Sequence, residues 1–109
     1  MMLTSYPEVP TDPGVTRQVL SERPELMVVA FRFQVEGAEG RLHSHPHVQS
    51  TYVESGRFAF TVGSESFEVV AGQSFVIPSN EVHGCRCLTP GTLIDTFAPR
   101  RDDFLTLTS

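Results

Sequence analysis

The apolar residues of this 109-residue chain never sustain the spacing of an amphipathic helix for more than about two turns. Short stretches of alternating apolar residues are instead separated by Gly, Pro, Asn and Ser at intervals of about 8 to 12 residues. The clearest alternation lies in residues 26–35, where every second position is apolar: Met27, Val29, Phe31, Phe33 and Val35. This pattern predicts an all-β sandwich or barrel of about eight short strands.

The length suits a single domain with one modest core. We expect three parts: an extended N-terminal arm (residues 1–13), a barrel (14–98) and a charged tail (99–109). Pro7, Pro10 and Pro13 each fix φ and remove an amide donor, so the arm is expected to stay outside the core. Such an arm can pair with the sheet of a neighbouring subunit.

The charge and the N-terminus narrow the classes of partner. A formal net charge of -5 argues against nucleic acid, because binding to phosphates requires clustered Lys and Arg. The N-terminus lacks the cationic start and apolar stretch of a signal peptide, and no apolar run approaches the roughly 18 residues of a membrane span. We therefore expect a cytoplasmic protein that binds neither nucleic acid nor membrane.

The chain has two cysteines, Cys85 and Cys87. In a strand they lie on one face, too close in sequence for an unstrained disulfide. We expect two free thiols that act as small buried hydrophobes, which suits a reducing compartment.

All four histidines lie in residues 37–56 and 72–87. In an extended strand, His43 and His45 project to the same side about 6 to 7 Å apart, a spacing that suits two ligands of one metal ion. His83, on a distant strand, and the amide of Gln49 can complete the set. A lone histidine is more often structural, but three that converge in a small β domain favour a metal site.

Pro46 interrupts the proposed metal strand and predicts a kink or an edge there, because it cannot donate to a central ladder. His47 directly follows this proline. We therefore expect His47 outside the ligand set, facing solvent or supporting the ligands from behind.

The two histidine segments resemble the two motifs of the cupin family, G(X)5HXH(X)3-4E(X)6G and G(X)5PXG(X)2H(X)3N. Positions that match are Gly37, His43, His45, Gly56, Gly72, Pro78 and His83. Gln49 stands at the usual Glu, and Asn80 and Cys87 replace the second motif's Gly and Asn. The resemblance implies a double-stranded β-helix, or jelly-roll, barrel with one metal ion near its mouth, usually as a homodimer.

Gln49 is the most informative departure from the family pattern. A neutral amide leaves the full charge of the ion in place, whereas Glu would lower it by one. The site should therefore favour Lewis-acid chemistry over oxygen activation. We expect one divalent ion, Ni or Zn first, while Fe, Mn, Cu and Co stay open because ligand type does not separate them.

Asp95 interrupts an apolar strand, sharing a face with Leu93 and Phe97. Asp is disfavoured in strands and costly to bury without partners. It is either a carboxylate bonded to a nearby turn or arginine, or an acid/base group facing the metal cavity. Charged residues in a run, such as Arg100 and Arg101, are mostly solvated. One of these two can nevertheless fold back over the barrel mouth to bind a substrate carboxylate.

The segment GTLIDTFAPRRDDFL, together with HSHPHVQ, resembles the pectin-degradation KdgF group within the cupins. That resemblance implies conversion of 4,5-unsaturated monouronates, released by pectin and alginate lyases, to linear keto uronates. It implies the metal ligands His43, His45, Gln49 and His83, and the catalytic residues Asp95, Phe97 and Arg101. The substrate would be an anionic sugar.

Two other functions stay open at this point: a cupin dioxygenase that uses iron or copper, and a non-catalytic small-molecule or carbohydrate-binding cupin. The remaining aromatic residues of the strands are expected to line the core rather than to touch a substrate. They are Phe31, Phe33, Phe58, Phe60 and Phe75.

Overall fold

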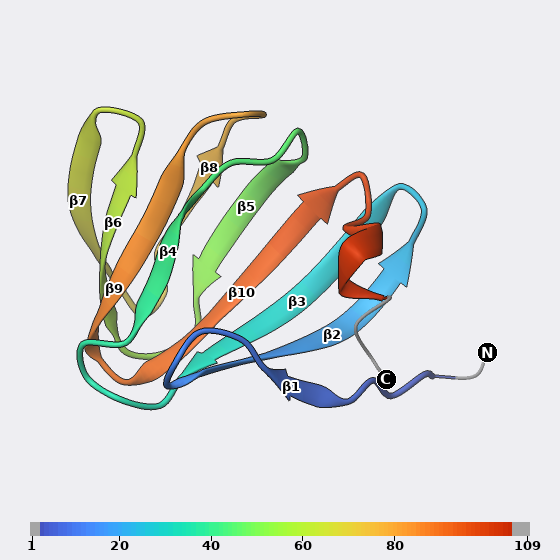
Figure 1. The fold of residues 1–109 in the computed structure, drawn as a ribbon, viewed down its shortest axis with the longest axis horizontal. Coiled ribbons are helices and arrows are strands. Elements are labelled where there is room, and N and C mark those ends of the chain that lie inside the picture. The colour runs from blue at the N-terminus through green and yellow to red at the C-terminus, as the bar shows by residue number, and fades with distance from the viewer. Residues whose placement is uncertain (1–2, 106–109) are drawn as a thin grey trace.

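Two antiparallel sheets make up the computed structural model, which describes residues 3–105 (Figure 1). The larger sheet contains, in spatial order, β1 (Glu8–Pro10), β2 (Val15–Arg23), β3 (Leu26–Phe33), β10 (Gly91–Ala98), β5 (Val48–Val53) and β8 (Ser74–Ile77). The smaller sheet contains β4 (Glu39–His43), β9 (His83–Thr89), β6 (Arg57–Val62) and β7 (Glu65–Val70). The predicted all-β class is confirmed.

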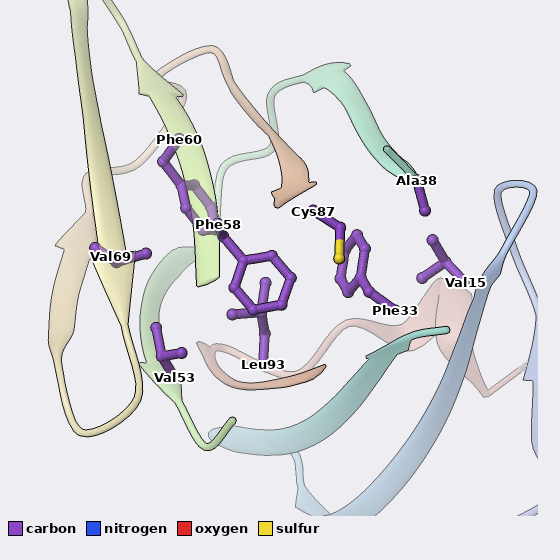
Figure 2. Packing of buried hydrophobic residues seen from close by; sticks show 9 residues of the cluster. All are labelled: Val15, Phe33, Ala38, Val53, Phe58, Phe60, Val69, Cys87 and Leu93. Atoms are coloured by element: carbon purple, nitrogen blue, oxygen red, sulfur yellow. The ribbon is translucent and has the colours of Figure 1, made fainter. Parts of the chain in front are cut away.

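The main core lies where the two sheets face each other. Alternation along the strands sends one apolar set inward, and the Phe33 and Phe58 side chains meet from opposite sheets with their ring centroids 5.1 Å apart (Figure 2). Both rings are buried, and burial of a phenylalanine side chain contributes roughly 1.5–3 kcal/mol. The cluster that holds the sheets together comprises Val15, Phe33, Ala38, Val53, Phe58, Phe60, Val69, Cys87 and Leu93.

The N-terminal arm is extended as predicted, but part of it belongs to the barrel. Residues Glu8–Pro10 form β1, which pairs antiparallel with β2 of the same chain, from Glu8 opposite Gln18 to Pro10 opposite Thr16. A proline is tolerated here because β1 is an edge strand. The arm therefore extends its own sheet, and β1 is an edge strand of that sheet.

The tail is more than a charged extension. A short 3-10 helix, η1 (Asp102–Phe104), folds back beside β2 and β3 (Figure 1) and buries Phe104. The Phe104 ring contacts Phe31 and Phe97 at centroid distances of 6.1 and 5.6 Å. Arg100 is tied to β2 by an ion pair with Glu22 at 2.8 Å. Residues 106–109 of the predicted tail lie outside the described residues.

The alternation read from residues 26–35 ends earlier than predicted. Strand β3 stops at Phe33, and Val35 is exposed. The chain then turns at Gly37, where φ is 88°, into β4. Within the described residues, no helix has the length and apolar character that a membrane span requires.

Gly56 closes the turn between β5 and β6 with φ of 83°, a conformation that L residues rarely adopt. A Cβ atom at this position would lie 2.5 Å from the Thr89 carbonyl oxygen. Gly72 has a similar φ of 93°, but a Cβ there would meet nothing within 4 Å. The two glycines therefore differ in steric room and not in backbone strain.

We predict that Gly56→Ala lowers the free energy of unfolding more than Gly72→Ala does. Backbone strain costs each variant roughly 1–3 kcal/mol, and the clash with Thr89 adds to the loss only at position 56. Urea unfolding midpoints of the two variants measure the difference. Equal losses would show that the close approach at Gly56 carries no cost.

Candidate metal centre

A cavity of about 900 Å³ lies between the two sheets, and the chain surrounds it with both sheets and the tail. Its walls include His43 and His83 from the smaller sheet, and Gln49 and Asp95 from the larger. A cavity of this size suits a small-molecule ligand.

Three imidazoles converge beside this cavity. Ligand nitrogens of His43, His45 and His83 all lie within 4.8 Å of one another. The ring centroids are 4.3 Å apart for His43 and His83, and 4.9 Å apart for His45 and His83. The predicted convergence of the three histidines is therefore present in the structure.

The elements that carry these histidines differ from the prediction that His43 and His45 share one strand. Strand β4 ends at His43, and residues 44–47 form a loop. Pro46 lies in this loop, where its missing amide hydrogen leaves no ladder hydrogen bond unmade. His43 then faces His83 directly, since the two residues are register partners between β4 and β9.

A second loop fixes the position of His45. The Asn80 amide donates to the His45 carbonyl at 2.8 Å, and the Ser79 hydroxyl donates to the Pro46 carbonyl at 2.6 Å. Asn80 has φ of 66°, the left-handed conformation that Asn tolerates better than most residues. This explains how Asn can stand at a motif position that usually holds Gly.

Each of the three histidines is oriented by a backbone carbonyl two residues away. The Nδ1 atoms of His43, His45 and His83 lie 2.7, 3.0 and 2.8 Å from the carbonyl oxygens of Arg41, His47 and Glu81. A carbonyl only accepts, so each Nδ1 carries the hydrogen. All three Nε2 atoms are thereby left as potential ligands, the arrangement that metal-binding histidines usually show.

Burial keeps two of the imidazoles, those of His45 and His83, neutral. Burial lowers the pKa of His83 to about 4, and the positive charges of neighbouring groups add a smaller effect. Burial, followed by the charge of Arg101, also lowers the pKa of His45. Near neutral pH both rings therefore hold a lone pair that a metal ion can take.

Gln49 lies at the same point, on β5, and is buried. Its Oε1 lies 3.0 Å from His45 Nε2. Because the hydrogen of that ring is on Nδ1, both atoms present lone pairs at this point. The Nε2 of Gln49 donates to the Thr51 hydroxyl at 3.0 Å, which leaves the oxygen directed at the imidazole cluster.

The residues present fit a divalent ion. Three imidazoles and an amide oxygen are the nitrogen and oxygen donors that such ions accept in proteins. The Nε2 atom of His83 is buried and has no hydrogen-bond partner among the described residues. A buried acceptor without a partner is costly, and a cation would satisfy it.

Asp95 lies in the centre of β10 and is buried. Its Oδ1 accepts a 2.7 Å hydrogen bond from the Thr51 hydroxyl, so a chain of hydrogen bonds runs from the amide of Gln49 through Thr51 to Asp95. Burial raises the pKa of Asp95 to about 7, although bonds from Thr51 and Gln49 and the charge of Arg101 oppose the shift. A carboxyl with this pKa can both take and give a proton near neutral pH.

The other two predicted catalytic residues lie beside Asp95. Phe97 is 1% exposed, with its ring 5.6 Å from that of His45 and 5.2 Å from the guanidinium carbon of Arg101. Phe97 therefore holds these neighbours and leaves little ring surface for a sugar. Arg101 lines the cavity and is held by Asp103 through two hydrogen bonds of 3.1 and 2.9 Å.

Sequence reasoning missed some residues of the cavity. Phe31, Phe33 and Phe60, predicted to line only the core, also line the cavity. Sequence reasoning also did not name Arg17, Thr51 or Phe104 as candidate residues. Arg17 alternates with Val15 and Val19 on the buried face of β2, and this pattern was a usable signal.

The remaining candidate residues lie at the edge of the site. His47 is half-buried and contributes its carbonyl to His45, but its imidazole is not part of the three-histidine group. Cys85 and Cys87 are free thiols, as predicted. Cys85 lines the cavity, and burial raises the pKa of its thiol to about 12, so it is protonated and unreactive.

Comparison with known proteins identifies a matching family and a similar relative. Residues 30–97 match the family described as Cupin domain. The pectin degradation protein KdgF of Dickeya dadantii (strain 3937) is 37% identical over 94 residues, which is 84% of each chain.

Two solved structures share the fold at useful identity. An RmlC-like cupin from Shewanella frigidimarina NCIMB 400 is 41% identical with a TM-score of 0.86, over 91% of this chain and 88% of that one. KdgF from Halomonas sp. is 36% identical with a TM-score of 0.85, over 91% of this chain and 93% of that one. The predicted cupin barrel is therefore confirmed.

We predict that His83→Ala weakens the binding of Ni or Zn by more than the 10- to 100-fold that loss of a supporting partner typically costs. His83 Nε2 has no other partner to satisfy, whereas His47 supplies only its backbone carbonyl. Chelator competition measures both affinities, with His47→Ala as the matched control. Unchanged affinity in His83→Ala would remove His83 from the ligand set.

We predict a pH-dependent stability difference between the metal-free wild type and Asp95→Asn. The folded-state pKa of Asp95, about 7, exceeds its ordinary value of 3.8, so the folded state binds more protons between these pH values. Wild-type stability should therefore fall relative to the variant as the pH rises from about 4 to about 7, by at most about 1.4 kcal/mol per pH unit. Urea unfolding at several pH values measures this, and a pH-independent difference would contradict the raised pKa.

Proposed function

The chain belongs to the cupin family and is a homologue of the pectin degradation protein KdgF, and we propose that it is a metal-dependent enzyme that converts 4,5-unsaturated monouronates to linear keto uronates. One observation carries the proposal: the buried carboxyl of Asp95, with a pKa of about 7, lines the same cavity as His43, His83 and Gln49, and His45 completes the imidazole cluster beside it. Proton transfer and metal binding can then act on the same small molecule.

The residues that would hold the ion are His43, His45, Gln49 and His83. When bound, a divalent ion such as Ni or Zn supplies a Lewis acid that polarises a substrate oxygen. The neutral amide of Gln49 adds no negative charge to this set. The carbonyl-bound Nδ1 atoms hold the imidazoles in place and restrict their rotation.

The proposed reaction is an isomerisation and needs no second reactant. The hydroxyl on the anomeric carbon loses a proton, the bond between that carbon and the ring oxygen breaks, and an aldehyde and an enol remain. The enol becomes a ketone when the carbon at the far end of the double bond gains a proton. Asp95, which can hold or release a proton near neutral pH, is the group we assign to this transfer.

Residues near Asp95 orient its side chain and are placed to hold the substrate. Thr51 donates to one carboxylate oxygen and so holds the side chain in one orientation. Arg101 stands beside Asp95 with its guanidinium fixed by Asp103, and we assign it to the substrate carboxylate. Phe97 keeps the His45 ring and the Arg101 guanidinium in contact with a rigid surface.

The dioxygenase and the non-catalytic carbohydrate-binding cupin are separated from this proposal by simple measurements. A dioxygenase consumes oxygen, which an oxygen electrode detects, whereas the proposed isomerisation does not. A binding protein would show tight binding of a uronate by calorimetry without turnover. The homodimer, the cytoplasmic location and the identity of the metal stay predictions.

We predict that Asp95→Asn lowers the rate with unsaturated galacturonate by 10²- to 10⁴-fold, because loss of a positioned proton-transfer group typically costs this much. The measurement is loss of the absorbance of the conjugated double bond above the uncatalysed rate, at equal metal content. Asp102→Asn is the matched control, since that carboxylate is exposed and pairs with Arg100. Wild-type turnover by Asp95→Asn would refute the assigned role.

A further inference from the structure

Arg17 is a buried cation without a paired anion. It points inward from β2 between Val15 and Val19 and is 8% exposed. Among residues 3–105, its guanidinium forms no ion pair and no side-chain hydrogen bond, and burial lowers its pKa. A buried charge is costly unless it is paired, so a partner from outside the chain would compensate for this one.

Arg17 and Arg101 both lie over the aromatic ring of Phe104. The guanidinium carbons of the two arginines lie 4.1 and 4.2 Å from the centroid of that ring. Phe104 is itself fixed against Phe31 and Phe97. The tail therefore supplies the surface on which one arginine from β2 and one from the chain's end are aligned.

The charges of this cluster do not balance. Asp103 is held by Arg101 through two hydrogen bonds, and its charge also favours the protonated form of Arg17. The two guanidinium groups share the carboxylate of Asp103, and the carboxyl of Asp95 near Arg101, with a pKa of about 7, is only partly ionised near neutral pH. Positive charge is therefore in excess among the described residues. An additional anion would neutralise it.

Arg17 and Arg101 line the same cavity as His43, His83 and Asp95. In the larger sheet, β3 alone separates β2 from β10, the strand that carries Asp95. Neighbouring strands lie about 4.8 Å apart, so the backbone of Arg17 is separated from that of β10 by about 10 Å across the sheet. A small molecule in contact with Asp95 can thus present an anionic group to both arginines.

We propose that Arg17 and Arg101, aligned on Phe104, form the site that binds the carboxylate of the substrate and thereby selects acidic over neutral sugars. The identity of the ligand as a uronate rests on the proposed function; the anion site itself rests on the unpaired charge. Arginine suits this role because its planar fork can donate two hydrogen bonds to one carboxylate.

The test uses the metal-loaded protein and two unreactive probes, galacturonate and its neutral counterpart galactose. Arg17→Met should weaken galacturonate binding by about 10- to 100-fold, as expected for loss of a charged hydrogen bond, and leave galactose binding unchanged. The galacturonate affinity of Arg17→Lys should lie between those of Arg17→Met and wild type, since lysine keeps the charge but lacks the planar fork of arginine. NMR titration measures these affinities, and Arg57→Met, on the exposed face of β6, is the matched control.

The stability of Arg17→Met distinguishes a ligand-binding role of Arg17 from a structural role. If Arg17 serves the ligand, removal of its unpaired buried charge should leave the urea unfolding midpoint of Arg17→Met equal to or above that of wild type. Galacturonate affinity unchanged in Arg17→Met, or reduced equally for galactose, would overturn the proposal. Because neither probe reacts, these outcomes are independent of whether unsaturated uronates are turned over.

Discussion

The site depends on one repeated interaction, a hydrogen bond from a histidine Nδ1 to a backbone carbonyl two residues away. It occurs at His43, His45 and His83, although one lies at the end of a strand, one in a loop and one at the start of a strand. The Nδ1 hydrogen is donated in this bond, so the Nε2 lone pair stays available to a metal ion. The loop contacts of Ser79 and Asn80 then hold the His45 segment against the His83 segment.

Behind the imidazoles, a buried polar chain couples the two candidate functions of the site. Gln49 and Thr51 lie two residues apart on β5, so both face the interior, and Thr51 is the register partner of Asp95 on β10. The proposed metal ligand Gln49 and the proposed proton-transfer group Asp95 therefore share one hydrogen-bonded framework. Keeping Asp95 and Arg17 buried costs stability, as is common where a site is built for a ligand.

Several features of the fold and the site were predictable from local patterns. Alternating apolar residues predict strands, and the spacing of His43 and His45 along an extended chain predicts two ligands of one metal ion. The prediction that both lie on one strand was wrong, because β4 ends at His43 and His45 lies in the following loop. Arg17 could have been noticed, since its alternation with Val15 and Val19 indicates burial, but the alternation does not reveal what a buried arginine faces.

Phe104 illustrates what local patterns cannot supply. It follows a run of charged residues, and only the fold of η1 onto β3 shows that it is buried and aligns two arginines. The sequence by itself determined the strand pattern, the types of metal ligand and the presence of an acid in an apolar strand. The tertiary structure alone decided the convergence of the imidazoles, the raised pKa of Asp95 and the placement of Arg17 and Arg101 over one aromatic ring. The physical reason is that each of these depends on burial and on contacts between residues far apart in the chain.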